Sequence, residues 1–372
     1  MKVKVLFLFP RFYIGGVSKA LSFVANTCEE AGMDVYCISM TSQPKTIHLN
    51  DNIHREIIDI KEEAIGIKKK WNRVSFMYQF RKRIKQISPN IIIVFRADLV
   101  KAVVYATIGL KIPIIGSERG NPLLYGNLLN TYRKVFKRCS AIVYQTDAAR
   151  SVYNIDCKSV IIPNPAVLRL NNFALHKNRV GRNFVSVGRL SKEKNIEGLI
   201  RAFALGKEKL TDRKLILYGD GPDEQNLRIL AKSLRLEDSI VFAGNVKDFS
   251  SINDEASIFI LNTLSEGMPN ALIEAMIAGY ACICTDCPIG APRWLSDHGR
   301  RIKLVPVKDD KALADAMVEI ATNEIRANEL ADNASEIIEI LHPHKISNMW
   351  ISLINEIIDE HNKENRPKNI IS

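Results

Sequence analysis

The sequence lacks any long apolar segment and has few cysteines. No apolar run approaches the roughly 20 residues that a helix needs to span a bilayer. The apolar start, Val5 to Phe9, is too short for the hydrophobic core of a signal peptide and runs directly into Pro10. The 7 cysteines are an odd number scattered over 372 residues, which predicts reduced thiols in a cytosolic protein. We therefore expect a chain that is soluble or lies on a membrane surface.

Motifs of several common enzyme classes are missing as well. No G-x-G-x-x-G follows the strand that opens either half of the chain, which argues against a nicotinamide oxidoreductase. No Asp-x-Asp follows an apolar strand, where it could hold a metal–diphosphate complex. Cys282, Cys284 and Cys287 have no obvious fourth ligand nearby, so small buried thiols explain them better than a metal site. The sequence thus predicts neither a metal nor another cofactor.

Acidic residues are scarce in the first half of the chain. Residues 1–180 hold 28 Lys and Arg against 12 Asp and Glu, a net charge of +16, whereas the remainder has a net charge of −5. Such asymmetry suggests that the first half meets an anionic surface or ligand. The extreme case is the stretch 68–85, which has no acid and eight basic residues: Lys68, Lys69, Lys70, Arg73, Arg81, Lys82, Arg83 and Lys85.

The same stretch carries apolar residues near helical spacing, namely Trp71, Val74, Met77, Tyr78, Ile84 and Ile87. One interpretation is a crossover helix with this stripe in the core and its charges in water. The other is a helix face that lies on anionic lipid. The two are compatible if only the basic side touches headgroups.

Short apolar segments alternate with helical patterns along both halves of the chain. The first series of expected strands is Lys2–Phe9, Asp34–Met40, Ile91–Phe95, Ile112–Gly116, Ala141–Gln145 and Ser159–Ile162. The second is Phe184–Gly188, Lys214–Tyr218, Ser239–Ala243, Ser257–Leu261, Ala281–Thr285 and Lys303–Val305. This alternation predicts an α/β protein of two Rossmann-like, doubly wound parallel-sheet domains, with the ligand crevice at the carboxyl ends of the strands, in a central cleft between the domains.

The expected boundaries follow from the two series. We predict a first domain over residues 1–165, a linker over 166–182 without clear periodicity, and a second domain over 183–345. A last helix is expected over 346–360, with an apolar stripe through Trp350, Leu353, Ile354 and Ile357. Residues 361–372 form a polar tail.

The segment Ser265 to Met276 is the richest in functional signals. It follows an expected strand, and Pro269 and Asn270 favour the first turn of a helix that Gly279 stops. The N–H groups at that helix start suit a phosphate. Glu266 and Glu274 are poor phosphate ligands but good acceptors for sugar hydroxyls, so the segment predicts a nucleotide-sugar pocket. As a glycosidase pair they would be too far apart, since eight helical residues span about 12 Å.

Other expected site residues follow the strands of the same domain. Arg189 and Lys194 come after its first strand and can clamp a diphosphate, offsetting negative charge on a leaving nucleotide. Gly219 follows the next strand and permits a tight turn near the nucleotide, although an ordinary strand-to-helix turn would also explain it. The backbone around Asn245 and Val246 could hydrogen-bond a base edge. In the first domain, Gly15 and Gly16 would let the backbone approach a phosphate.

These motifs together resemble glycosyltransferase family 4, retaining enzymes of the GT-B fold. The resemblance rests on Val187-Gly188-Arg189-Leu190 with Lys194, Gly219-Asp220-Gly221-Pro222, Glu266 to Glu274, Thr285-Asp286-Cys287-Pro288 and Leu304-Val305-Pro306-Val307. It covers most of the second domain. In the first domain it rests on Gly15-Gly16 and Ile162-Pro163-Asn164-Pro165.

The resemblance implies roles for matching positions. Arg189 and Lys194 would bind the donor diphosphate, and Glu274 the ribose. Donor sugar contacts would come from Glu266 and the backbone of Gly267, Met268, Pro269 and Asn270. Gly16 would let its loop close over the phosphates. The family further implies a metal-independent reaction and a last helix that crosses back to the first domain. No protein nucleophile is required, because the departing phosphate helps to deprotonate the acceptor.

One position departs from the family pattern. Many members carry a histidine after the fourth strand of the first domain, where this chain has Glu118 followed by Arg119. This resembles a subgroup that builds bacterial surface polysaccharides such as O-antigen, capsule and exopolysaccharide. Glu118 or Arg119 could contact the acceptor or the sugar, or could form a structural salt bridge.

We therefore expect a glycosyltransferase (hexosyl- or N-acetylhexosaminyltransferase) that uses a nucleotide diphosphate sugar, and we expect this donor to be a UDP-sugar. The expected acceptor is a polyprenyl-diphosphate-linked saccharide. The expected location is the cytoplasmic, inner face of the cell membrane, which the basic first domain would contact, and no nucleic-acid partner is expected. The alternatives are a nucleotide-sugar epimerase or phosphorylase on the same fold, and a basic anion- or nucleic-acid-binding protein, which would bind with a steep salt dependence.

Overall fold

The computed structural model describes residues 2–10, 16–41, 47–59, 67–166, 183–246, 252 and 256–365. The chain divides into two compact units. Unit 1 comprises Met1–Asn164 and His344–Ser372, and unit 2 comprises Pro165–Pro343. The chain therefore passes from unit 1 to unit 2 after Asn164 and returns after Pro343. Residues 167–182 of the expected linker and 366–372 of the expected tail lie outside the described residues.

Unit 1 is built on a parallel sheet of seven described strands in the order β3-β2-β1-β4-β5-β6-β7. The order reverses between β1 and β4, which makes the sheet doubly wound. The central strands are uninterrupted apolar runs because both of their faces are covered. The strands are β1 (Lys4–Phe9), β2 (Asp34–Ser39), β3 (His54–Ile57), β4 (Ile91–Phe95), β5 (Ile114–Ser117), β6 (Ala141–Tyr144) and β7 (Ser159–Ile161).

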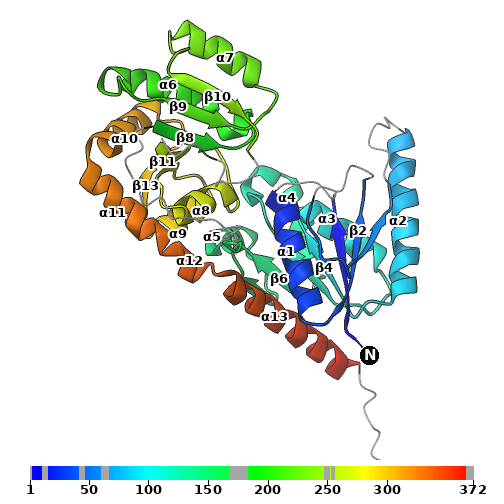
Figure 1. Ribbon diagram of the computed structural model, residues 1–372. Coiled ribbons are helices and arrows are strands. Elements are labelled where there is room, and N and C mark those ends of the chain that lie inside the picture. The colour runs from blue at the N-terminus through cyan, green and yellow to red at the C-terminus, as the bar shows by residue number, and fades with distance from the viewer. Residues whose placement is uncertain are drawn as a thin grey trace, which may run out of the picture. The chain divides into compact units, whose positions relative to one another are not determined.

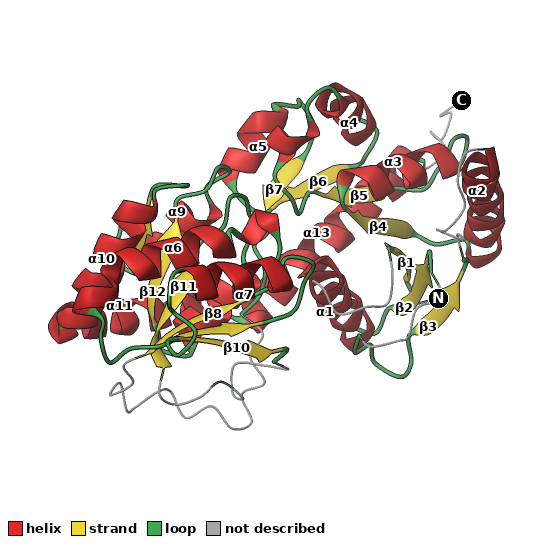
Figure 2. Ribbon diagram, turned by 90° about the horizontal axis from the view of Figure 1, so that it is seen from above, coloured by secondary structure: helices red, strands yellow, loops and turns green. Residues whose placement is uncertain are grey.

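Helices cover both faces of this sheet (Figure 2). Helices α3, α4 and α5 lie on one face, with α2 packed beside α3, and helices α1 and α13 lie on the other. The helices of unit 1 are α1 (Gly16–Glu30), α2 (Ile67–Ile87), α3 (Ala97–Ala106), the 3-10 turn η1 (Pro122–Tyr125), α4 (Leu128–Phe136), α5 (Asp147–Tyr153) and α13 (Pro343–Glu364).

Unit 2 repeats the plan with six described strands in the order β10-β9-β8-β11-β12-β13, all parallel (Figure 1). The order reverses between β8 and β11. The strands are β8 (Asn183–Val187), β9 (Leu215–Tyr218), β10 (Ile240–Gly244), β11 (Ala256–Leu261), β12 (Ala281–Thr285) and β13 (Ile302–Val305).

In unit 2, helices α6, α7 and α10 enclose one core, on one face of the sheet, and α8, α9 and α12 enclose another on the opposite face. The helical elements are η3 (Lys192–Lys194), α6 (Ile196–Gly206), η4 (Lys207–Lys209), α7 (Glu224–Ser233), α8 (Asn270–Ile277), α9 (Ala291–Ser296), α10 (Asp310–Thr322), α11 (Glu324–Ser335) and α12 (Ile337–Ile340).

The prediction of two doubly wound parallel-sheet domains is confirmed, with one strand that the pattern missed. Strand β3 (His54–Ile57) reads His-Arg-Glu-Ile and pairs only with β2 at the edge of the sheet. An edge strand is half solvated, so it needs no continuous apolar run. Its polar sequence therefore gave no strand signal.

Helix α2 corrects the predicted apolar stripe of the basic stretch. Val74 and Tyr78 are exposed, at 60% and 71%, while the buried face is formed by Phe76, Phe80, Ile84 and Ile87. These four follow the spacing i, i+4, i+8 and i+11, which keeps one helix face toward the core. The side chains of Lys68, Lys69, Lys70, Trp71 and Arg73 lie outside what the structure describes.

Helix α13 returns the chain to unit 1, as the GT-B resemblance implies. Its Trp350, Leu353, Ile354 and Ile357 join the core formed by α1 and the strands of the first sheet. The ring of Trp350 stacks on Phe95 with centroids 5.6 Å apart. The helix is longer than predicted because proline is tolerated in a first helical turn and His361 and Lys363 suit the last turn.

We predict that Trp350→Ala destabilises the protein by about 3–5 kcal/mol, because it empties a buried aromatic site. The matched control is Met349→Ala on the same helix, whose side chain is 37% exposed and whose loss is expected to cost about 0.5 kcal/mol or less. Chemical denaturation of the two variants measures the difference. Equal midpoints would contradict the packing of α13 described above.

Candidate functional site

Most of the expected site residues of unit 2 follow the carboxyl ends of β8, β9, β10 and β11, and those of the central strands β8 and β11 lie at the switch point. This is where the strand order reverses, the usual position of a ligand crevice in an open α/β sheet. The loop after β8 is hydrogen-bonded to the end of β11, because Glu193 O accepts from Leu264 N at 2.9 Å and from Thr263 Oγ1 at 3.2 Å. Asn262 Nδ2 donates to Asn195 O at 3.0 Å. These bonds bring two segments together that are some 70 residues apart.

Lys194 and Glu266 meet at this point. The Lys194 Nζ forms an ion pair with Glu266 Oε1, and both side chains are mostly shielded from solvent, at 25% and 13% exposed. The Lys194 stem runs beside Gly188, where an added Cβ would lie 3.9 Å from its Cδ and Cε. Arg189, by contrast, is exposed. The structure thus places two of the three expected catalytic side chains in contact, with the third on the same loop.

Gly219 and Gly221 are required by close contact between backbones. A Cβ at Gly219 would lie 1.9 Å from Gly188 O, and one at Gly221 would lie 2.2 Å from Leu190 O. Gly219 also has a φ of +135°, which side chains disfavour. Leu190 N donates to Asp220 O at 2.7 Å, and Gly219 N donates to Gly244 O at 2.7 Å. The role of Gly219 is therefore to let the loops after β8, β9 and β10 pack into one platform.

The segment from Glu266 to Glu274 is part loop and part helix. Helix α8 begins at Asn270 with Pro269 as N-cap, so Glu266 precedes the helix and Glu274 lies inside it. Gly267 and Asn270 are half-buried, and Met268 and Pro269 are buried. The helix ends as predicted, because Gly279 takes a φ of +82° and Tyr280 N donates to Ala275 O at 3.1 Å.

Asn245 and Val246 follow β10 at the far side of the platform. Asn245 Nδ2 donates to Asp220 Oδ2 at 2.5 Å, which ties the loop after β10 to the loop after β9. Val246 is half-buried and packs against the core that contains α8. Both residues are therefore held on the same edge of the sheet as Arg189 and Gly219.

The expected residues of unit 1 divide into two groups. Gly15 lies outside the described residues, and Gly16 begins α1 just after the carboxyl end of β1. Glu118 and Arg119 follow β5 and are buried, at 1% and 8% exposed. No ion pair within 4 Å joins their two side chains.

Glu118 is held by four protein donors. Its Oε1 accepts from the backbone N of Arg119 at 2.9 Å, from Gly120 N at 2.8 Å and from Tyr125 Oη at 3.0 Å. Its Oε2 accepts from Tyr153 Oη. Burial raises the pKa of both tyrosines above the usual value, with the Glu118 carboxylate as a second cause, so they remain donors. This geometry favours an internal structural role for Glu118 over contact with a ligand.

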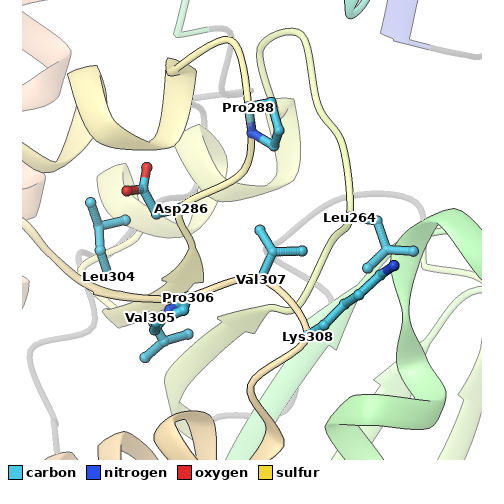
Figure 3. Close-up of a pocket in the computed structure, with 8 residues that line it drawn as sticks. All are labelled: Leu264, Asp286, Pro288, Leu304, Val305, Pro306, Val307 and Lys308. Atoms are coloured by element: carbon cyan, nitrogen blue, oxygen red, sulfur yellow. The ribbon is translucent and has the colours of Figure 1, made fainter. Parts of the chain in front are cut away.

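A pocket of about 760 Å³ lies beside the Glu266 loop at the carboxyl ends of β11, β12 and β13. Figure 3 shows Leu264 and Lys308 together at one end and Asp286 and Leu304 toward the other. Six of the eight lining residues are apolar: Leu264, Pro288, Leu304, Val305, Pro306 and Val307. Asp286, Pro288 and the segment Leu304 to Val307 belong to motifs that carry the family resemblance, but the sequence assigned no site role to them.

The cysteines of the second domain are buried free thiols. Cys282 and Cys284 lie on β12, and burial raises the pKa of the nearby Cys287 thiol to about 11. Within the described ranges, no group of three or more His, Cys, Asp or Glu side chains is arranged to hold a metal ion. In the same ranges, no helix has the length and apolar character to cross a bilayer.

Comparison with known proteins identifies the region that matches a glycosyltransferase family. The model of the family described as "Glycosyl transferases group 1" matches residues 171–337. An uncharacterized glycosyltransferase of Haemophilus influenzae is 28% identical over 291 residues, which covers 76% of this chain and 80% of that protein. A second relative covers almost the whole chain. It is a Campylobacter jejuni protein named as an α-1,4-N-acetyl-D-galactosaminyltransferase of a diNAcBac-PP-undecaprenol-linked glycan, 25% identical over 368 residues, 95% of this chain and 99% of that one.

Among solved structures, Anabaena HepE in complex with UDP and glucose superposes with a TM-score of 0.78 at 15% identity, over 95% of this chain and 99% of that chain. At this identity the likeness concerns the fold. The chain is therefore a glycosyltransferase of GT-B fold, with its glycosyl transferases group 1 region in the second unit.

Proposed function

We propose that the protein is a retaining glycosyltransferase that moves a sugar from a UDP-sugar to a polyprenyl-diphosphate-linked oligosaccharide in the synthesis of a bacterial surface polysaccharide. The observation that carries the proposal is the Lys194–Glu266 pair on the platform at the switch point of the second sheet. It sets a cation for phosphate beside a carboxylate for sugar hydroxyls.

The donor would bind along this platform. Arg189 and Lys194 bind the diphosphate and offset the charge that develops on the leaving nucleotide. Glu266 and the backbone from Gly267 to Asn270 hold the sugar, and Glu274 holds the ribose. Because side-chain cations take the part that a metal plays elsewhere, we propose that the reaction needs no metal. A ligand at Lys194 competes with the Glu266 carboxylate, so donor binding would rearrange this ion pair.

The nature of the acceptor is supported by relatives. The Campylobacter jejuni relative has a PP-undecaprenol-linked glycan in its name and aligns over 95% of this chain. Such an acceptor is confined to a membrane surface by its lipid, so the enzyme must reach that surface. We propose that it is peripheral, at the inner face of the cell membrane.

The layer formed by α2, α3 and α4 is the surface we assign to this contact. Residues 67–140, which contain these helices, hold 16 Lys and Arg, of which Arg119 is buried, against 2 Asp and Glu. Exposed apolar side chains are interspersed on it: Val74 at 60%, Tyr78 at 71%, Tyr105 at 45%, Ile108 at 54%, Leu123 at 53%, Leu124 at 68% and Leu128 at 53%. Basic groups with scattered apolar and tyrosine side chains are typical of surfaces that bind anionic lipid.

The donor site is tested by binding and by turnover. In a thermal-shift panel of UDP-, GDP- and dTDP-sugars, we expect the UDP-sugar to stabilise the protein, by about 2.7 kcal/mol at a hundredfold excess over Kd. Glu266→Ala should reduce transfer about 100- to 1000-fold with a small change in melting temperature. The matched control is Glu224→Ala, which breaks the surface pair of Glu224 with Arg228 on α7 and should leave transfer near the parent level.

Unchanged turnover in Glu266→Ala would reject its assigned role. Absence of a shift with any nucleotide sugar would reject the function itself. Conversion of the UDP-sugar without an acceptor would indicate an epimerase, and a requirement for phosphate would indicate a phosphorylase.

The membrane surface is tested by vesicle sedimentation. We predict that Lys82→Gln, Lys85→Gln and Lys134→Gln together weaken binding to phosphatidylserine vesicles about 100-fold, since each exposed Lys contributes about 1 kcal/mol near an anionic bilayer. The control changes three exposed lysines of unit 2, Lys209, Lys232 and Lys311, to Gln. Equal loss in both triple variants would mean that total charge, not this layer, binds the lipid.

A further inference from the structure

Arg119 is a buried cation between two aromatic rings. It follows β5 and is 8% exposed, and its Cζ lies 4.2 Å from the ring centroid of Phe95 and 5.6 Å from that of Trp350. It lies on the opposite side of the strand end from Glu118, which the tyrosines of η1 and α5 hold. Burial lowers the pKa of Arg119 to about 9, with the neighbouring Glu118 charge opposing that change.

The guanidinium fixes the orientation of two amides. Arg119 Nη1 donates to Asn164 Oδ1 at 3.0 Å, and Gln145 Nε2 donates to the same oxygen at 2.8 Å. An arginine can only donate, so the atom facing it must be the oxygen of Asn164. The Gln145 atom that faces this oxygen must then be its nitrogen. The arginine therefore determines which atom is oxygen and which is nitrogen in the side-chain amides of both Asn164 and Gln145.

Three polar atoms of this cluster have no hydrogen-bond partner among the described residues. They are Nε and Nη2 of Arg119 and Oε1 of Gln145, and all three are buried. Nε and Nη2 lie on one edge of the guanidinium and donate side by side. Buried polar groups left without partners are rare and costly, and ordered water usually satisfies them.

The three atoms differ in what they can bind. Two are donors and one is an acceptor, which is the complement of a single water molecule that accepts twice and donates once. A buried water with three partners is the ordinary case. A free oxyanion would match the two donors but would be repelled by Gln145 Oε1. The chemistry of the cluster therefore favours water.

The position of the cluster gives it a role. Asn164 is the last residue of unit 1 before the chain passes to unit 2, and Trp350 belongs to α13, which follows the return at Pro343. Phe95, Arg119 and Gln145 stand at the ends of β4, β5 and β6. One side chain thus touches both segments through which unit 1 is connected to the rest of the chain.

We propose that Arg119 is a positioning residue that anchors both chain connections, at Asn164 and at Trp350, to the edge of the first sheet, and that one buried water molecule bridges Arg119 and Gln145 to complete the site. Its effect on catalysis rests on the proposed function, because sugar transfer needs both units to close on their ligands. The anchoring of the two chain connections is independent of the proposed function.

Hydrogen exchange of the full chain tests the anchor. Arg119→Met keeps an unbranched stem on Phe95 but removes every N–H, and Arg119→Lys keeps the charge but not the planar fork. Both should raise exchange in the segments 161–166 and 344–353 about tenfold, or about 1.4 kcal/mol. Tyr153→Phe is the matched control, since it removes one buried hydrogen bond from Glu118 on the other face and should lower the melting temperature without affecting those segments.

If Arg119→Met does not fold, Gln145→Leu serves as the second variant. We expect it to raise hydrogen exchange in the segment 161–166 alone. Unchanged exchange in the arginine variants, or the same increase in Tyr153→Phe, would overturn the anchor. If hydrogen exchange in Arg119→Lys equals that of the parent protein, the charge alone is enough to anchor the two segments, and the proposed water bridge is overturned. The readouts for catalysis are kcat, expected to fall about tenfold in Arg119→Met, and the Kd for UDP. That Kd is expected to stay unchanged because Arg189 and Lys194, the cations proposed to bind the diphosphate, lie in unit 2. If exchange rises while no nucleotide binds the parent, the anchor stands and the proposed function fails.

The water itself is tested by a crystal structure in which solvent is resolved. Density for one atom within hydrogen-bond distance of Arg119 Nε, Arg119 Nη2 and Gln145 Oε1 would support the bridge. Stabilisation of the parent by nitrate or phosphate that Arg119→Met lacks would show an anion site and overturn it.

Discussion

The candidate donor site depends on the hydrogen bonds that join loops across the switch point of the second sheet. Leu264 N and Thr263 Oγ1 both donate to Glu193 O, and so the end of β11 and the turn before α6 move as one piece. Lys194 and Glu266 lie on two separate loops, and this junction holds the two loops together. The two glycines after β9 allow the third loop to join because nothing larger fits against the backbone of Gly188 and Leu190. Preorganised charges of this kind stabilise a transition state without reorganisation at the moment of reaction.

Much of this arrangement could be predicted from the sequence because its signals are local. A buried parallel strand must be apolar on both faces. Twelve of the thirteen labelled strands were therefore visible as apolar runs, whereas His54–Ile57 was not. The start of α8 was marked by Pro269 and its end by Gly279. Arg189, Lys194 and Glu266 were predicted as site residues because their residue types follow strand ends, where parallel sheets gather their ligands.

The sequence could not predict contacts between residues that lie far apart in the chain and have several possible partners. Glu118 and Arg119 were open to a ligand, an acceptor or each other, and only the fold shows two tyrosines around one and two aromatic rings around the other. The face of α2 was misjudged because a stretch with apolar residues at many positions admits more than one stripe. Packing against α3 decides between them, and Val74 and Tyr78 are left outside. The apolar pocket beside Glu266 is assembled from residues at the ends of three strands. Two of these segments carry the family resemblance, but a sequence motif does not show that they enclose one cavity.

Residues 67–140 contain only two acids, and this scarcity of negative charge affects the kinetics of association. Asp98 is occupied by the guanidinium of Arg96, and Glu118 is enclosed by its four donors. Arg83 is paired with Glu56, but the basic residues of this stretch still greatly outnumber its acids. The field of the exposed cations extends into solvent by about one Debye length, about 8 Å at physiological ionic strength. Encounter with any negatively charged assembly would be accelerated in dilute buffer and slowed as salt is added.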